Sequence, residues 1–218
     1  MDLQSFLLAV SVGAIPLVFA ITVHEVAHGW VARRYGDRTA EAAGRLTLNP
    51  IKHIDPIDTL LLPAMQLLFF GRVLFGWARP VPVNERYLRN PRRDMVKVAI
   101  AGPAANVLMA LIWAAVFAVV SRLGSVGGPS DWGLQMALTG VMFNIMLAAF
   151  NLLPVLPLDG GRVLVNSLPQ GRLTRFLESL EPWGLLIVVT LLVTGLAQAF
   201  VVPLAEALSS AVFSMVGL

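Results

Sequence analysis

Long apolar stretches separated by charged loops dominate the pattern of hydrophobic and polar positions along the chain. A helix that spans a lipid bilayer needs about 20 predominantly apolar residues. Four uncharged stretches reach this length: Leu3–Val23, Val98–Ser121, Trp132–Leu158 and Pro182–Ala205. The pattern therefore predicts an all-α membrane protein, a polytopic helical bundle with about four full spans.

Two shorter apolar stretches, Thr59–Gly71 and Ala207–Leu218, are too short to span a bilayer comfortably. We expect each to be re-entrant, partial, interfacial or packed against other helices. The loop Gly36–Arg93 mixes Gly, Pro and β-branched residues, which is typical of turns and short strands. A small β-like region is expected there, with Phe75–Asn84 as an edge strand or irregular hairpin.

Composition supports a membrane protein. Of the 218 residues, 57% are hydrophobic and 13% are charged, whereas a soluble domain has about 45–50% and about 25%. So little charge cannot cover the surface of a soluble fold, and it argues against a disordered or nucleic-acid-binding chain. The chain has no cysteine, which excludes disulfide frameworks and thiolate metal sites.

The positive charges are concentrated in a few loops. Of the 16 Lys and Arg residues, 12 lie between Arg33 and Lys97, and Arg122 stands alone in a later loop. The other three follow the third long stretch: Arg162, Arg172 and Arg175. If Thr59–Gly71 does not cross, 15 of the 16 charges share one side, which the positive-inside rule makes cytoplasmic.

The sequence HEVAH occupies residues 24–28, at the end of the first apolar stretch. On a helix His24 and His28 share one face, so both imidazoles can converge on one metal ion. Glu25 is adjacent to the first of them and can reach a metal-bound water as a general base. The alternative is a set of polar residues bonded to nearby backbone at a helix end. Ionisable groups in an apolar span are costly, which favours the metal site.

A catalytic zinc ion usually has three protein ligands and an open position for water. Asp159, in FNLLPVLPLDGGR (Phe150–Arg162), is the candidate for the third ligand. Pro154 and Pro157 break the helix, and such a break is tolerated at membrane depth where it lines a cavity. The first and third spans run in the same direction, so His28 and Asp159 should reach a similar depth near the cytoplasmic face. The alternative for Asp159 is a carboxylate in a helix-terminal turn.

Together, HEVAHG, AGPAAN (Ala101–Asn106) and FNLLPVLPLDGGR resemble the site-2 protease family of intramembrane zinc metalloproteases. The segments GRLTLNP, KHIDP and GWARPVPVN are similar to its compact prokaryotic branch, which has no PDZ domain. The resemblance implies one catalytic Zn²⁺ held by His24, His28 and Asp159, with Glu25 as the catalytic glutamate. It implies hydrolysis of peptide bonds in or near transmembrane segments of membrane proteins, by Glu25-assisted attack of a zinc-bound water.

On this basis we expect a single membrane-embedded metalloprotease domain over residues 1–218, with a catalytic core at about 5–165 and C-terminal helices at about 166–218. The protein should be an integral multi-pass protein of a prokaryotic cell membrane, with its active site towards the cytoplasmic face. Its partners should be the lipid bilayer and a transmembrane substrate, not nucleic acid. A metal transporter or a non-proteolytic scaffold is the alternative, but no matching halves are found and Glu25 is not needed as a ligand.

Several other polar residues are candidates for supporting roles. Asn106 matches a polar residue on the neighbouring core helix of the family, where it would stabilise an oxyanion or make an interhelical hydrogen bond. Asn144 and Asn151 share a helix face and could support the ligands or link helices. His53 and Asp55 could form a second polar cluster near the site or lie in a solvated loop.

Overall fold

The computed structural model describes residues 3–53, 80–123 and 129–218, and the regular elements among these residues are all helices, with no β-strand. In chain order, the α-helices are α1 (Leu3–Arg34), α2 (Thr39–Ala42), α4 (Pro91–Leu123), α5 (Pro129–Asn151), α6 (Asp159–Ser167), α7 (Arg172–Ser179), α8 (Gly184–Val193) and α9 (Leu196–Met215). Short 3-10 helices are η1 (Pro50–Lys52), η3 (Glu85–Tyr87) and η4 (Glu181–Trp183).

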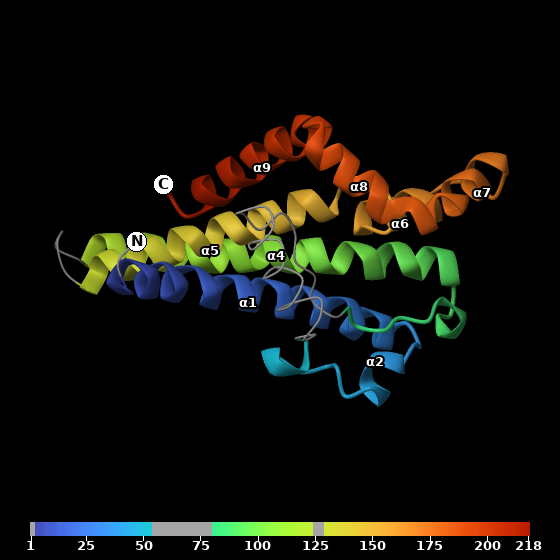
Figure 1. The fold of residues 1–218 in the computed structure, drawn as a ribbon. Helices are drawn as coiled ribbons and strands as arrows, with labels where there is room; N and C mark the ends of the chain where they lie inside the picture. Colours follow the sequence, from blue (N-terminus) through green and yellow to red (C-terminus); the bar gives the residue numbers. More distant parts are fainter. Residues whose placement is uncertain (1–2, 54–79, 124–128) are drawn as a thin grey trace.

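Three long helices, α1, α4 and α5, form the centre of the bundle and alternate in direction (Figure 1). Their contacts are made largely by small side chains, because small residues let helix backbones approach closely in an apolar environment. The completely buried alanines of these helices are Ala20, Ala32, Ala110, Ala114, Ala137, Ala148 and Ala149. The short helix α6 packs against α4, and α9 packs against α5 and α4.

Five helical segments of the described chain are long and apolar enough to cross a membrane: Ser11–Arg34, Pro91–Arg122, Asp131–Asn151, Arg172–Val193 and Leu196–Met215. The first three overlap the first three predicted stretches, although the first extends to Arg34 and not only to Val23, and α5 ends at Asn151 and not at Leu158. The prediction of a polytopic helical membrane protein is therefore confirmed.

The fourth predicted span, Pro182–Ala205, is wrong as a single helix. Helix α8 ends at Val193, and α9 begins at Leu196 after Gly195, whose φ of 79° lies in the left-handed region that favours glycine. The predicted short stretch Ala207–Leu218 belongs to α9 for most of its length. Figure 1 shows α8 and α9 leading, one after the other, from the end of the bundle that holds α7 toward the end where the N-terminus lies.

The expected edge strand Phe75–Asn84 is described only over residues 80–84, and these residues form no strand. The backbone N–H of Asn84 donates to Asp37 Oδ2 at 2.7 Å, and Pro80 and Pro82 have no N–H to donate. Residues 80–84 are therefore fixed to the turn that follows α1, and they pair with no strand among the described residues. The predicted re-entrant stretch Thr59–Gly71 lies outside the described residues.

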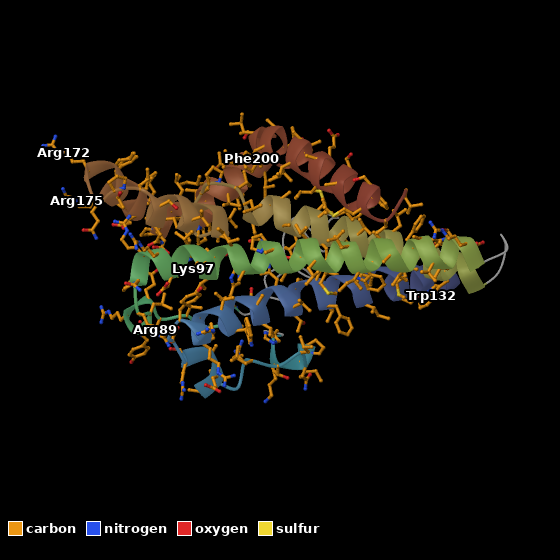
Figure 2. All side chains as sticks on the ribbon, turned by 180° about the vertical axis from the view of Figure 1, so that it is seen from behind. Arg89, Lys97, Trp132, Arg172, Arg175 and Phe200 are labelled. Carbon is orange, nitrogen blue, oxygen red and sulfur yellow. The ribbon has the colours of Figure 1, made fainter. Side chains whose placement is uncertain are left out.

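Basic side chains mark one end of the bundle. In Figure 2, Arg89, Lys97, Arg172 and Arg175 lie at one end, and Trp132 lies at the opposite end. These basic residues come from the beginning of α4, the loop before it, and α7, which are far apart in the sequence. These four basic residues, which the sequence predicts for one side of a membrane, thus lie at one end of the folded chain.

Arg92, in the first turn of α4, fastens the far end of α6. Its guanidinium Nη2 donates to the carbonyl oxygens of Val165 and Leu168, at 2.7 and 2.5 Å. The last carbonyls of a helix have no partner within the helix, so a cation there stabilises the helix end. Arg92 therefore holds α6 against α4.

Replacing Arg92 by Met would keep an unbranched apolar side chain and remove both hydrogen bonds. We expect the free energy of unfolding to fall by about 1.5–3 kcal/mol, because the lost donor is charged. Denaturant or thermal unfolding of the detergent-purified protein measures the change. Arg93→Met, at the exposed neighbouring position, is the matched control, and an equal effect of the two substitutions would contradict this role of Arg92.

Candidate metal centre

Two histidines of α1 face each other inside the bundle. His24 and His28 are one helical turn apart, and they are only 5% and 9% exposed. Their rings meet edge to face with centroids 4.6 Å apart, and their Nε2 atoms are 3.0 Å apart. The four-residue spacing thus brings two ring nitrogens to one place.

Helix α4 holds the other ring nitrogen of each histidine. His28 Nδ1 donates to the carbonyl oxygen of Val98 at 2.7 Å, and His24 Nδ1 donates to Asn106 Oδ1 at 2.5 Å. Val98, Gly102 and Asn106 follow one another at intervals of four, so they lie on one face of α4. One face of α4 is therefore matched to the two-histidine face of α1.

Gly102, in the middle of this face, leaves the space that the imidazole rings fill. A Cβ atom at Gly102 would overlap His28 Nε2 and would lie 2.6 Å from His24 Cε1. Gly102 is not among the site residues predicted from the sequence. The sequence shows that Gly102 lies four residues before Asn106. This spacing indicates a role for Gly102 only once the histidine pair is known to pack on this face of α4.

Asp159, the first residue of α6, completes the group. Its Oδ2 atom lies 3.3 Å from His24 Nε2, and its Oδ1 atom lies 3.4 Å from His28 Nε2. The structure therefore brings the three predicted metal ligands together from α1 and α6. All three are at least nine-tenths buried.

The turn before α6 places this carboxylate. Helix α5 ends at Asn151, and the following residues fold closely over the first turn of α6. A Cβ atom at Gly160 would overlap the backbone of Leu152, and one at Gly161 would overlap the backbone at Leu156. Only glycine allows so close an approach of two backbones. The glycine pair of LPLDGG is thus a condition for the position of the carboxylate.

The hydrogen-bond partners fix where the protons of the histidines are. The Val98 carbonyl can only accept, so His28 Nδ1 carries a hydrogen and the Nε2 of the neutral ring presents a lone pair. Asn106 Oδ1 imposes the same arrangement on His24. Both Nε2 lone pairs then point at one another and at the carboxylate of Asp159.

Such a cluster of acceptors is suited to a cation. Asp159 Oδ2 is buried without a hydrogen-bond partner among the described residues, and buried acceptors left without a donor or a cation are costly. The three ligand atoms lie within 4.8 Å of one another. Two imidazoles and one carboxylate are a known ligand set of catalytic zinc, with one position left for water. These residues therefore fit a zinc ion.

Glu25 is held by a residue far away in the sequence. Its Oε2 atom accepts the backbone N–H of Val81 at 2.7 Å. Gly29, one turn further along α1, makes room for this segment, because a Cβ atom there would lie 2.8 Å from Val81 Cγ1 and 2.6 Å from Leu46 Cδ2. The carboxylate of Glu25 is thus oriented through one oxygen. No pattern in the sequence links Val81 to α1.

The other predicted polar residues are placed differently. The side-chain N–H₂ of Asn106 donates to Ala20 O and to Asn144 Oδ1, at 3.0 Å each, so it has no N–H left for an oxyanion. The side chain of Asn151 donates to Leu147 O within α5. His53 is buried and its Nε2 donates to Thr47 O at 2.9 Å. Asp55 lies outside the described residues.

Comparison with known proteins identifies the family. The family model for peptidase family M50 matches residues 12–130 and 128–195, and these ranges include the histidine pair, Glu25 and Asp159. The chain belongs to peptidase family M50. The resemblance to the site-2 protease family, which rests on the motifs, is thereby confirmed.

Similar proteins occur in bacteria and archaea. YwhC of Bacillus subtilis, named a zinc metalloprotease, is 39% identical over 195 residues, which are 88% of this chain and 85% of YwhC. Rip2 of Mycolicibacterium smegmatis, also named a zinc metalloprotease, is 32% identical over 81% of this chain and 64% of its own. The zinc metalloprotease MJ0392 of Methanocaldococcus jannaschii is 25% identical over 68% of this chain, which is 32% of its own. No solved structure matches the chain. This M50 chain is accordingly a zinc metalloprotease.

Gly102→Ala tests the fit between α4 and the histidines of this M50 protein. The added methyl group would displace both rings, so we expect zinc affinity to fall about tenfold or more, as for other changes around metal ligands. Competition with a chromophoric chelator measures the affinity. Gly13→Ala is the control, because a Cβ atom there meets only Phe143 Cε2 at an ordinary 3.9 Å. Unchanged zinc affinity in Gly102→Ala would show that the rings do not need this space.

Proposed function

We propose that this M50 protein is an intramembrane endopeptidase that hydrolyses peptide bonds in or near transmembrane segments of membrane proteins. The observation that carries the proposal is the buried acceptor cluster of His24, His28 and Asp159 on helices of a membrane-spanning bundle, with Glu25 beside it. A substrate that reaches this cluster has to meet it between helices long enough to span a bilayer.

We assign the three clustered residues as the ligands of one zinc ion. When bound, zinc supplies Lewis acidity toward a water molecule and toward the scissile carbonyl. The Nδ1 hydrogen bonds to α4 fix both imidazole rings and leave each Nε2 free, so that these two atoms would hold the ion. The carboxylate of Asp159 would contribute negative charge that balances part of the charge of the ion.

Glu25 is proposed as the general base and then the general acid. Its Oε2 is occupied by the Val81 N–H, which leaves Oε1 to accept a proton from the attacking water. The same carboxyl then gives this proton to the nitrogen of the leaving amine. The hydrogen bond from Val81 therefore orients the base without neutralising it.

A substrate helix has to unwind locally before attack, because its backbone carbonyls are hydrogen-bonded within the helix. An extended substrate segment then needs new hydrogen-bond partners. The N–H groups of Val81 and Asn84 already bind Glu25 and Asp37. In residues 80–84, pairing with the substrate would accordingly rely mainly on backbone carbonyls.

We further propose that the basic end of the bundle faces the cytoplasm of a prokaryotic cell. The concentration of Arg and Lys at that end supports this orientation through the positive-inside rule (Figure 2). His28 lies less than two helical turns before Arg33 and Arg34, the basic residues at the end of α1. The active site would then be embedded near the cytoplasmic face.

Glu25→Gln tests the assigned chemistry. Glutamine keeps an oxygen for the Val81 N–H but cannot accept a proton, so cleavage of a single-span substrate should fall by about 10²–10⁴-fold. Zinc content should stay at the wild-type level. The assay uses detergent-purified protein and follows substrate fragments, with Glu178→Gln on the exposed side of α7 as the control. Full cleavage by Glu25→Gln would remove Glu25 from the mechanism.

Substitution of each proposed ligand tests the metal centre separately. We expect His24→Ala, His28→Ala and Asp159→Asn each to lose bound zinc and cleavage together, because three ligands are the usual minimum of a catalytic site. Elemental analysis of purified protein gives the zinc content. If Asp159→Asn retained zinc while the histidine variants lost it, the third ligand would be a different residue.

A further inference from the structure

Two asparagines lie at the centre of the bundle, where α1, α4 and α5 meet. Asn106 of α4 and Asn144 of α5 are both completely buried, at 0% exposure. Val141 and Ile145, three residues before and one residue after Asn144 in α5, are also buried. Buried amides in an apolar bundle are costly unless every polar group is satisfied. Their hydrogen bonds therefore show what they are arranged to do.

The orientation of Asn144 is fixed by its own helix. Its Nδ2 donates to the carbonyl oxygen of Gly140, one turn back in α5, at 2.8 Å. A carbonyl oxygen can only accept, so the amide nitrogen of Asn144 has to be on this side. Asn144 Oδ1 is thus turned toward α4, where it accepts from Asn106 Nδ2 at 3.0 Å.

The orientation of Asn106 follows from that of Asn144. Its Nδ2 lies 3.0 Å from two oxygens, Asn144 Oδ1 and the backbone oxygen of Ala20, and both can only accept. If the amide of Asn106 were flipped, its oxygen would face Asn144 Oδ1 and Ala20 O, and none of these three oxygens can donate a hydrogen bond. Asn106 Oδ1 is therefore directed at His24 Nδ1, which it meets at 2.5 Å.

From this chain of contacts we infer that Asn144 and Asn106 form an amide relay that fixes the tautomer and ring orientation of His24. The relay begins at the backbone of Gly140, in a helix that contributes none of the three proposed metal ligands, and ends at His24 Nδ1. It keeps a hydrogen on Nδ1, so that Nε2 always presents its lone pair to the metal. Both asparagines are positioning residues and not catalytic ones.

The relay treats the two histidines unequally. His28 Nδ1 donates to a backbone carbonyl, which any residue at position 98 would supply. His24 depends instead on two side chains from two helices, and Asn106 also clamps α1 at Ala20, one turn before His24. The packing of α5 against α1 and α4 is thereby coupled to metal affinity through one ring.

Nitrogen NMR of ¹⁵N-histidine-labelled, zinc-loaded protein tests the tautomer of His24 without a substitution. The chain has only three histidines, so three ring systems have to be assigned. We expect His24 to carry its hydrogen on Nδ1 and to bind the metal through Nε2. A His24 ring that binds through Nδ1, or carries its hydrogen on Nε2, overturns the relay.

Asn144→Leu tests the more distant member. Without an acceptor for its N–H, Asn106 can turn, so we expect zinc affinity to fall about tenfold, at the low end for groups behind metal ligands. Asn106→Leu, which removes the direct partner of His24, should weaken zinc binding by up to about 100-fold. The absorption spectrum of the cobalt-substituted protein should change in both variants, because the geometry of the ligands changes.

Two variants separate this role from simple packing. Asn144→Asp should restore most of the affinity, since a protonated carboxyl offers the same donor to Gly140 and the same acceptor to Asn106. Asn166→Leu is the control: the side chain of Asn166 likewise donates one turn back, to Arg162 O at 2.9 Å, but Asn166 is not part of the hydrogen-bonded chain from Gly140 to His24. Equal losses in Asn144→Leu and Asn166→Leu, or no loss in Asn144→Leu, would refute the relay.

The inference rests on the proposed zinc site, and the measurements distinguish the two. Absence of zinc from the wild-type protein would refute the site itself. Zinc in the wild-type protein with unchanged affinity in Asn144→Leu would refute only the relay. If Asn144→Leu does not fold, the NMR measurement on the unaltered protein still decides.

Discussion

Everything in this site depends on a repulsion that a cation relieves. Two imidazole nitrogens and a carboxylate converge, and the hydrogens that could separate them are placed on the opposite side of each ring. In an apolar bundle such an arrangement is unfavourable by itself and becomes favourable when a metal ion binds. The backbone geometry, the glycine positions and the buried amides all serve this convergence.

The match between two helices makes the arrangement possible. His24 and His28 are four residues apart in α1, and the residues of α4 that face them, Val98, Gly102 and Asn106, follow at the same interval. Because both helices have about 3.6 residues per turn, a spacing of four keeps such partners in register over two turns. Gly102 leaves space for the two imidazole rings, and Val98 and Asn106, one turn before and after it, accept hydrogen bonds from their Nδ1 atoms.

The sequence predicts those parts of the site that depend on local geometry. The convergence of His24 and His28 follows from helical spacing, and the break before Asp159 follows from its prolines and glycines. The hydrogen bond from Val81 to Glu25 could not be predicted, because it joins residues 56 apart that share no pattern. The break between α8 and α9 could not be predicted either, because the residues on both sides of Gly195 are apolar and fit one long helix as well as two.

The elements that meet at the site also explain why a zinc ion would do more than catalysis. Its proposed ligands come from α1 and α6, and α6 is otherwise held in place by its packing against α4 and by Arg92 at its far end. A ligand that binds only the folded state stabilises it in proportion to its affinity. Binding of the proposed zinc ion would therefore secure the near end of α6, which carries Asp159, while Arg92 secures the other end. A short helix fastened at both ends keeps its first carboxylate in place, and that position determines whether two histidines become a metal centre.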